Sequence, residues 1–179
     1  NNISTPSVAT KKLLTMNNLL TIVFGLAASL CWGSGDFSGG LASRRSNASS
    51  VVTVAYAVGF VLLVALALLW REPLPSLTNI MWGALAGLLG AIGLIAFYSA
   101  LSIGRMGIVA PTSALLTASL PVLFSMLTAG LPSLFQVAGF ILALAAIVLI
   151  SRPERAKGRP VGIGLALIAG CGFGLFFII

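Results

Sequence analysis

One acidic residue stands out because it is the only Asp in the chain and it lies within an apolar stretch. Asp36 sits late in the first hydrophobic run, whereas Glu72 and Glu154 fall between such runs. An ionised carboxylate at the centre of a membrane helix costs about 2.5–3.5 kcal/mol on insertion scales, so such acids usually face a cavity or a partner. Asp36 is therefore a candidate substrate-cation contact or proton carrier. The alternative is a helix-end residue that reaches headgroup water near Arg44 and Arg45.

A polar stripe runs along a second apolar stretch, residues 108–129. Its members recur at steps of four, four, four and three residues, on one face of a helix: Ser113, Thr117, Pro121, Ser125 and Thr128. The proline removes one backbone hydrogen bond and frees a carbonyl, and a broken backbone at membrane depth is tolerated where it lines protein or a watery cavity. We favour a cavity-lining stripe. The alternative is that the hydroxyls bond back to their own helix or hold neighbouring helices together.

Two aromatic residues extend the candidate site. Trp32 could stack on a substrate or pack against another helix, and Tyr98 could meet the cavity or join Trp70 and Trp82 in an interfacial belt. The predicted substrate-cavity residues are Trp32, Asp36, Tyr98, Ser113, Thr117 and Pro121.

Signals of an enzyme are absent from the sequence. It contains no His, no Cys/His metal spacing, no paired carboxylates, no P-loop and no nucleophile elbow. We therefore expect no catalytic residues, no metal site and no cofactor.

Composition indicates a membrane protein. Hydrophobic residues make up 59% of the 179 residues, charged residues 7%, and the mean hydropathy is +1.12, whereas soluble domains carry about 25% charged residues. A net charge of +7 would suggest nucleic acid in a soluble protein, but nearly all Lys and Arg lie between apolar runs. They are better explained as topology signals and lipid-headgroup contacts, with no nucleic-acid partner. Both cysteines lie in apolar stretches, so no disulfide framework is implied.

Six apolar runs are long enough to predict membrane helices, joined by short links. They cover residues 19–40, 51–70, 79–101, 108–129, 132–150 and 161–179. Three basic residues fall on the N-terminal side of the membrane and seven on the other side, so the positive-inside rule places the N-terminus outside. Gly83, Gly87 and Gly90 form a small-residue face, which suits helix contacts within one chain or between two chains of a homodimer.

A stretch of the first run recurs in the last one. Residues 25–37 read GLAASLCWGSGDF and residues 164–176 read GLALIAGCGFGLF, with six of thirteen positions identical. Five spans separate the two starts, so the second copy enters the membrane in the opposite orientation. Inverted repeats of membrane helices are typical of secondary transporters, whose site lies at the repeat interface near the midplane.

Four stretches in order carry a further pattern. Residues 27–37 contain Trp-Gly, 97–104 an aromatic–Ala-Leu–Gly run, 110–122 a Pro-Val pair, and 135–151 an apolar closing helix. Together they resemble the EamA-type family of the drug/metabolite transporter superfamily. The resemblance implies ten helices in two inverted five-helix repeats, and a central cavity lined partly by helices 1, 3 and 4. It also implies export or exchange of small metabolites, in a bacterial inner membrane. Two departures are a link without an acid at residues 130–133 and a charge count that opposes the family's cytoplasmic N-terminus, so orientation stays open.

These observations predict an all-α polytopic membrane helix bundle that is part of a longer transporter. We expect an N-terminal tail (1–16), a first five-helix repeat (17–151), a basic link (152–160) and the truncated first helix of a second repeat (161–179). The predicted function is alternating-access transport of a small metabolite, with proton coupling through Asp36 as one option. A non-transporting membrane scaffold or assembly subunit is the alternative; it would explain the glycine face but not the polar stripe.

Overall fold

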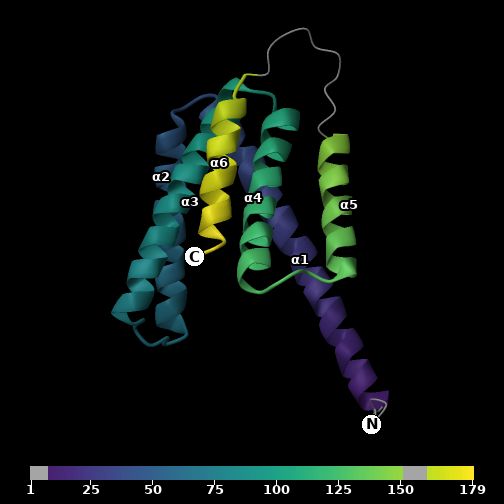
Figure 1. Ribbon diagram of the computed structural model, residues 1–179. Helices are drawn as coiled ribbons and strands as arrows, with labels where there is room; N and C mark the ends of the chain where they lie inside the picture. Colours follow the sequence, from purple (N-terminus) through teal and green to yellow (C-terminus); the bar gives the residue numbers. More distant parts are fainter. Residues whose placement is uncertain (1–7, 151–160) are drawn as a thin grey trace. The chain divides into compact units, whose positions relative to one another are not determined.

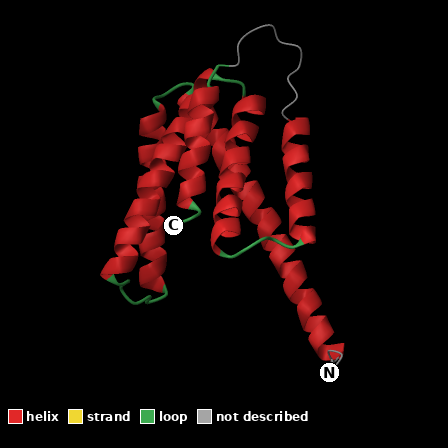
Figure 2. Cartoon of the chain, viewed as in Figure 1, coloured by secondary structure: helices red, strands yellow, loops and turns green. Residues whose placement is uncertain are grey.

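The computed structural model describes residues 8–150 and 161–179, with side chains from residue 19 onward except those of residues 148 and 150. The described chain contains six helices and no strand, which confirms the predicted all-α class (Figures 1 and 2). The helices are α1 (Val8–Ser43), α2 (Ala48–Leu69), α3 (Leu77–Ile103), α4 (Met106–Thr128), α5 (Leu134–Ile150) and α6 (Ile163–Phe176). Each lies where a span was predicted, although α1 begins well before residue 19. The predicted basic link, 152–160, lies outside the described residues.

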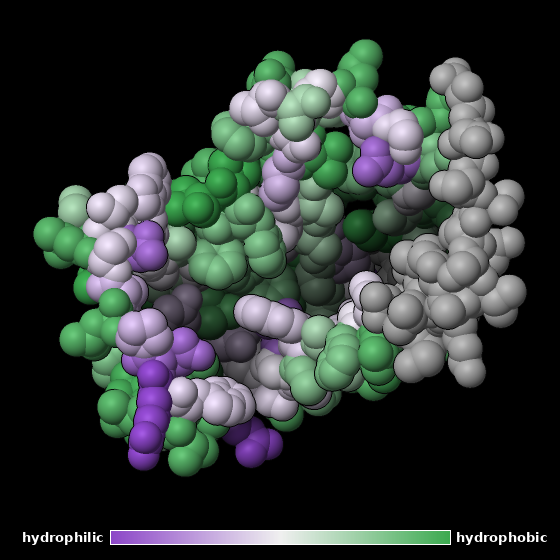
Figure 3. Space-filling view, turned by 90° about the horizontal axis from the view of Figure 1, so that it is seen from below, coloured by the Kyte–Doolittle hydropathy of each residue, from purple (hydrophilic) through white to green (hydrophobic). Residues whose placement is uncertain are grey.

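Length and hydropathy separate the helices into two groups. Among the described residues, α1 to α4 are each long and apolar enough to cross a membrane, whereas α5 and α6 are shorter apolar helices of 17 and 14 residues. At 1.5 Å per residue, α6 spans about 21 Å, less than the roughly 30 Å of a hydrocarbon core. Many large hydrophobic side chains along the helices are exposed, among them Phe60, Leu88 and Leu142. In Figure 3, which looks at the ends of the helices from below, hydrophobic and hydrophilic side chains both lie at the surface. A bilayer would solvate the exposed apolar side chains, as expected for a polytopic membrane protein.

Local hydrogen bonds explain where several helices begin. The Asn47 side chain accepts the N–H of Ser49 at 3.0 Å ahead of α2, and Ser76 Oγ accepts the N–H of Asn79 at 3.3 Å ahead of α3. At α5 the Gln136 side chain accepts the N–H of Ser133 at 2.8 Å while Ser133 Oγ accepts the N–H of Gln136 at 3.4 Å. This reciprocal pair is a capping box, which satisfies two donors that the helix itself leaves free.

The end of α2 uses a left-handed residue that is not glycine. Arg71 has φ 53°, its N–H donates to Leu68 O at 3.2 Å, and the N–H of Glu72 donates to Ala67 O at 3.0 Å. These two bonds define a Schellman motif. A side chain in this conformation costs about 1–2 kcal/mol, which the two bonds to the helix end offset.

The chain divides into two compact units, residues 1–38 and residues 39–179, so that α1 belongs mostly to the first and ends in the second. Within the second unit, α6 packs against both α3 and α4, which places it between them (Figure 1). α2 packs on α3, and α5 packs on α4. The buried core of this unit lies around α3 and α6: Ala48, Val52, Ala96, Phe97, Tyr98, Ala100, Leu101, Val109, Ala166 and Ala169.

Candidate functional site

A close approach between helices brings α6 against α3 at two glycines. A Cβ built on Gly172 would lie 2.9 Å from Gly93 Cα and 3.0 Å from Leu89 O. Both are backbone atoms, so no side-chain rearrangement would relieve the clash. Next to this contact, the rings of Phe97 on α3 and Phe173 on α6 meet edge to face, with their centroids 5.9 Å apart. Backbone contact and an aromatic pair therefore fix α6 on α3.

The opposite side of α6 lies against α4 through two more glycines. A Cβ on Gly170 would lie 2.7 Å from both Ser113 O and Leu116 Cβ, and one on Gly174 would lie 2.6 Å from Leu120 Cδ1. Small residues of this kind let helix backbones come close in a membrane, where van der Waals contact and hydrogen bonds drive association. α6 is thus wedged between the two helices that carry Tyr98 and the polar stripe.

The stripe on α4 divides along its length. Ser113 is 2% exposed where α6 approaches, Thr117 and Pro121 are half-buried, and Ser125 and Thr128 are exposed. The structure therefore brings three of the predicted site residues to one face of α4, near α6, while the far end of the stripe lies outside the packed region.

Hydroxyl groups on α4 bond back to their own helix. Thr117 Oγ1 donates to Ser113 O at 2.9 Å, and Thr128 Oγ1 donates to Phe124 O in the same way, also at 2.9 Å. This is the arrangement of the structural alternative. However, a hydroxyl that donates keeps its acceptor lone pairs. Since Pro121 has no N–H, the Thr117 carbonyl also lacks the helical bond that residue 121 would otherwise donate. The Thr117 segment consequently keeps acceptor capacity for a donor on a ligand or a neighbouring helix.

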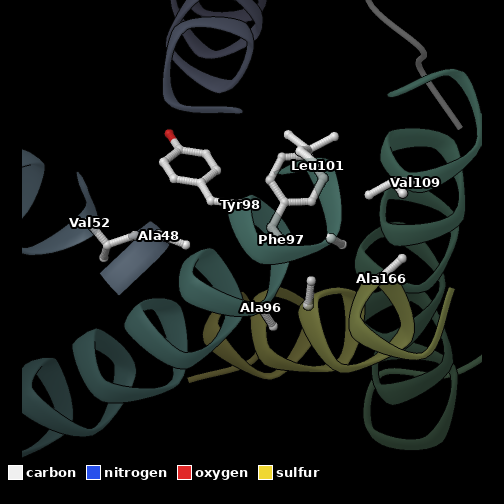
Figure 4. Packing of buried hydrophobic residues seen from close by; sticks show 10 residues of the cluster. Ala48, Val52, Ala96, Phe97, Tyr98, Leu101, Val109 and Ala166 are labelled. Atoms are coloured by element: carbon white, nitrogen blue, oxygen red, sulfur yellow. The ribbon is translucent and has the colours of Figure 1, made fainter. Parts of the chain in front are cut away.

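Tyr98 lies on another side of α3. It is 6% exposed, and its ring packs directly on Gly39, near the end of α1. In Figure 4 the ring lies on the side of Ala48 and Val52, with its hydroxyl pointing away from Phe97. Val109 and Ala166 lie on the other side of the same view. Tyr98 therefore serves the core of this unit rather than an exposed belt.

The remaining two predicted residues belong to the first unit. Trp32 is 65% exposed, and Asp36 is half-buried on the same helix. They are four residues apart, so they share one face of α1. Trp32 and Asp36 lie in a different unit from the candidate residues on α3 and α4.

Of the three glycines on α3 that the sequence singled out, only Gly90 makes a close helix contact. Gly83 and Gly87 have nothing within 4 Å of an added Cβ. Gly90 does have neighbours, since its added Cβ would lie 3.2 Å from Tyr56 Oη and 3.3 Å from Phe176 Cδ2. Gly93, which was not singled out, makes the tightest contact. Extending the glycine series one further step of three residues would have found it.

Side chains that bind metals do not gather in the described part of the chain. No group of three or more Cys, Asp or Glu side chains there could hold a metal ion. The Ser113–Pro121 part of α4 instead offers hydroxyl groups that can form hydrogen bonds with a neutral or weakly polar solute.

Comparison with known protein families identifies the family of this chain. The sequence matches the EamA-like transporter family over residues 19–152, which is most of the chain, and the chain therefore belongs to this family. No curated protein and no solved structure matches the chain. The matched region begins within α1 and extends past the end of α5, whereas α6 lies beyond it.

Proposed function

We propose that the protein is a secondary transporter that moves a small polar or amphipathic metabolite by alternating access. Membership of a transporter family supports this role. The observation that carries the proposal is the Ser113–Pro121 part of α4, which stays helical through Pro121 and whose Ser113 end lies against α6. There the half-buried Thr117 hydroxyl donates to Ser113 O and can still accept a hydrogen bond, and the Thr117 carbonyl lacks the N–H that a residue other than proline would supply at position 121. Polar groups with spare hydrogen-bonding capacity at membrane depth occur where protein or a cavity surrounds them.

The position of α6 supports a repeat interface at the same place. α6 contains the second copy of the 25–37 motif, and it packs between two helices that belong to the first copy of the predicted repeat. In inverted-repeat transporters the substrate lies where the repeats meet, and transport is rocking of one repeat against the other. Movement of α6 against α3 and α4 would then open and close access to the Ser113–Pro121 face. We propose that further helices, beyond these residues, complete the second repeat.

Each candidate residue has a separate role in the proposal. Ser113 and Thr117 provide hydrogen bonds, and Pro121 keeps the Thr117 carbonyl available. On α1, Trp32 provides an aromatic surface for the substrate, and Asp36 contacts a substrate cation or carries a coupling proton. Tyr98, buried in the second unit, supports the site from the core through its packing on Gly39. The setting we propose is a bacterial inner membrane.

Solute flux into proteoliposomes tests the transport role. The gene product that contains these 179 residues is reconstituted, and uptake of amino acids, amines and sugars is compared with and without a pH gradient. We expect saturable flux that Thr117→Val lowers about tenfold, because a lost hydrogen bond to a buried partner costs roughly 1–3 kcal/mol. Thr53→Val is the matched control, because Thr53 Oγ1 also donates to the carbonyl four residues earlier at 2.9 Å but is exposed on α2. Equal effects of the two changes would reject the site.

The role of Asp36 is tested in the same vesicles. If Asp36 carries the coupling proton, Asp36→Asn abolishes the dependence of flux on the pH gradient while facilitated exchange of solute persists. Unchanged pH dependence would remove Asp36 from the coupling step and leave it as a helix-end residue.

A membrane scaffold is the second candidate function. The glycine contacts of α6 with α3 and α4 favour it, because they hold helices together without providing any chemistry. Absence of flux for every solute, from protein with intact helical circular dichroism, would favour the scaffold over the transporter.

A further inference from the structure

Three arginines lie in two neighbouring turns at one end of the second unit. Arg44 and Arg45 form the turn between α1 and α2, and Arg105 lies between α3 and α4. Gly40 brings the two turns together, since a Cβ there would lie 2.8 Å from Leu101 Cδ1 and 2.9 Å from Met106 Cε. The last turn of α1 therefore packs against the start of α4.

Among the described residues of the second unit, no acidic side chain lies at this end. All three arginines are exposed, and none makes an ion pair within the described residues. In the described part of residues 39–179, Glu72 is the only acid, and it follows the opposite end of α2. Three like charges without a counter-charge repel one another, most strongly at a membrane surface where the dielectric constant falls. This end consequently favours an anion.

Two further groups there have unmet hydrogen-bonding capacity. Ser43, which precedes the arginine turn, is 6% exposed, and its Oγ is buried without a partner. The helix α4 begins at Met106, and the preceding Arg105 makes no side-chain cap, so its first N–H groups have no partner from the helix. A buried polar atom without a partner is rare in native proteins and calls for an explanation such as a bound water or ion. Helix N-termini and arginines are both common anion ligands.

We propose that this end binds the phosphate group of an anionic membrane lipid, through Arg44, Arg45 and Arg105 with the start of α4. The surroundings favour a lipid over a free anion, because exposed apolar side chains lie next to the arginines in the sequence. Leu41 is 47% exposed and Ile103 is 58% exposed. A free phosphate would use the arginines alone, whereas a lipid would also cover these side chains with its acyl chains. The site is independent of the transport function proposed above.

Lipid binding to the purified chain tests the site. The protein in neutral detergent is titrated with dioleoylphosphatidylglycerol, with dioleoylphosphatidylcholine and with inorganic phosphate, and bound lipid is counted by native mass spectrometry. We expect preferential binding of phosphatidylglycerol, weakened roughly tenfold or more in the variant R44Q/R45Q/R105Q, because each charge-assisted contact is strong. Arg71→Gln at the opposite end is the matched control and should change binding by less than about twofold.

Ser43→Ala provides a second variant that does not remove charge. Because Ser43 Oγ is buried and the proposed phosphate contacts come from exposed arginines, this change should leave phosphatidylglycerol binding unchanged. The single change Arg105→Gln replaces the triple variant if the latter loses its helical circular dichroism signal.

Two results would overturn the proposal. Equal loss of phosphatidylglycerol binding in Arg71→Gln and in the triple variant would mean that net charge alone attracts the lipid. Displacement of phosphatidylglycerol by inorganic phosphate, at an affinity matching its own, would assign the arginines to a free anion instead.

Discussion

The two copies of the repeated motif have opposite surroundings. In α6, Gly172 and Gly174 touch the backbone of α3 and the side chain of Leu120 on α4. In α1, the matching Gly33 and Gly35 have nothing within 4 Å of an added Cβ, and Phe37 beside them is 59% exposed. Identical residues therefore make a packed contact in α6, whereas within the first unit nothing crowds the glycines of α1.

The difference teaches what a glycine motif encodes in a membrane helix. It makes close approach possible, but the partner helix decides whether that approach occurs. α6 has its partners in α3 and α4, and the tight fit follows from the absence of side chains at the crossing points. The change in stability on substituting each of the matched glycines can therefore show how tightly each copy is packed.

The largest expected effect is at Gly172. Gly172→Ala places a Cβ 2.9 Å from Gly93 Cα, and because only backbone can yield there, we expect destabilisation by about 2–3 kcal/mol. The measurement is unfolding in mixed micelles, followed by helical circular dichroism. Gly164→Ala on the same helix is the control, since its Cβ meets nothing within 4 Å. Similar losses for both substitutions would show that α6 does not pack between α3 and α4.

A smaller effect is expected at Gly39, which is in the same helix as Gly33 but faces a neighbour. Gly39→Ala drives a Cβ into the Tyr98 ring, and since a ring can turn aside where backbone cannot, we expect a cost of about 1–2 kcal/mol. The Tyr98→Leu background should remove most of this cost in a double-mutant cycle measured by thermal unfolding. Gly59→Ala on α2, with nothing within 4 Å, is the control. Strict additivity of the two changes would rule out the contact.

The helices themselves could be predicted from the sequence, because long apolar runs between Arg, Pro and Gly have only one stable form in a membrane. The short links and the caps at Asn47 and Ser76 follow from residue types. Family membership was also predictable from ordered motifs, and the match over residues 19–152 confirms it.

The site was harder to predict, because periodicity gives a helical face without giving its neighbour. The stripe on α4 was correctly placed on one face, yet only its Ser113 end is buried by α6. Tyr98 offered both a cavity and an interfacial role, and the structure places it in the core against Gly39. Gly93 was missed for the same reason, since its importance comes from Gly172, 79 positions away in the sequence.

The smallest expected effect is at Gly33, and it tests the comparison most directly. Gly33→Ala adds a Cβ where nothing lies within 4 Å, and alanine favours a helix over glycine by roughly 0.5–1 kcal/mol. Stability of this chain should therefore change by less than about 1 kcal/mol, in the stabilising direction, in the same unfolding assay. A loss as large as that of Gly172→Ala would mean that a helix covers the α1 copy too. The two copies would then share one packing role, and the contrast between them would vanish.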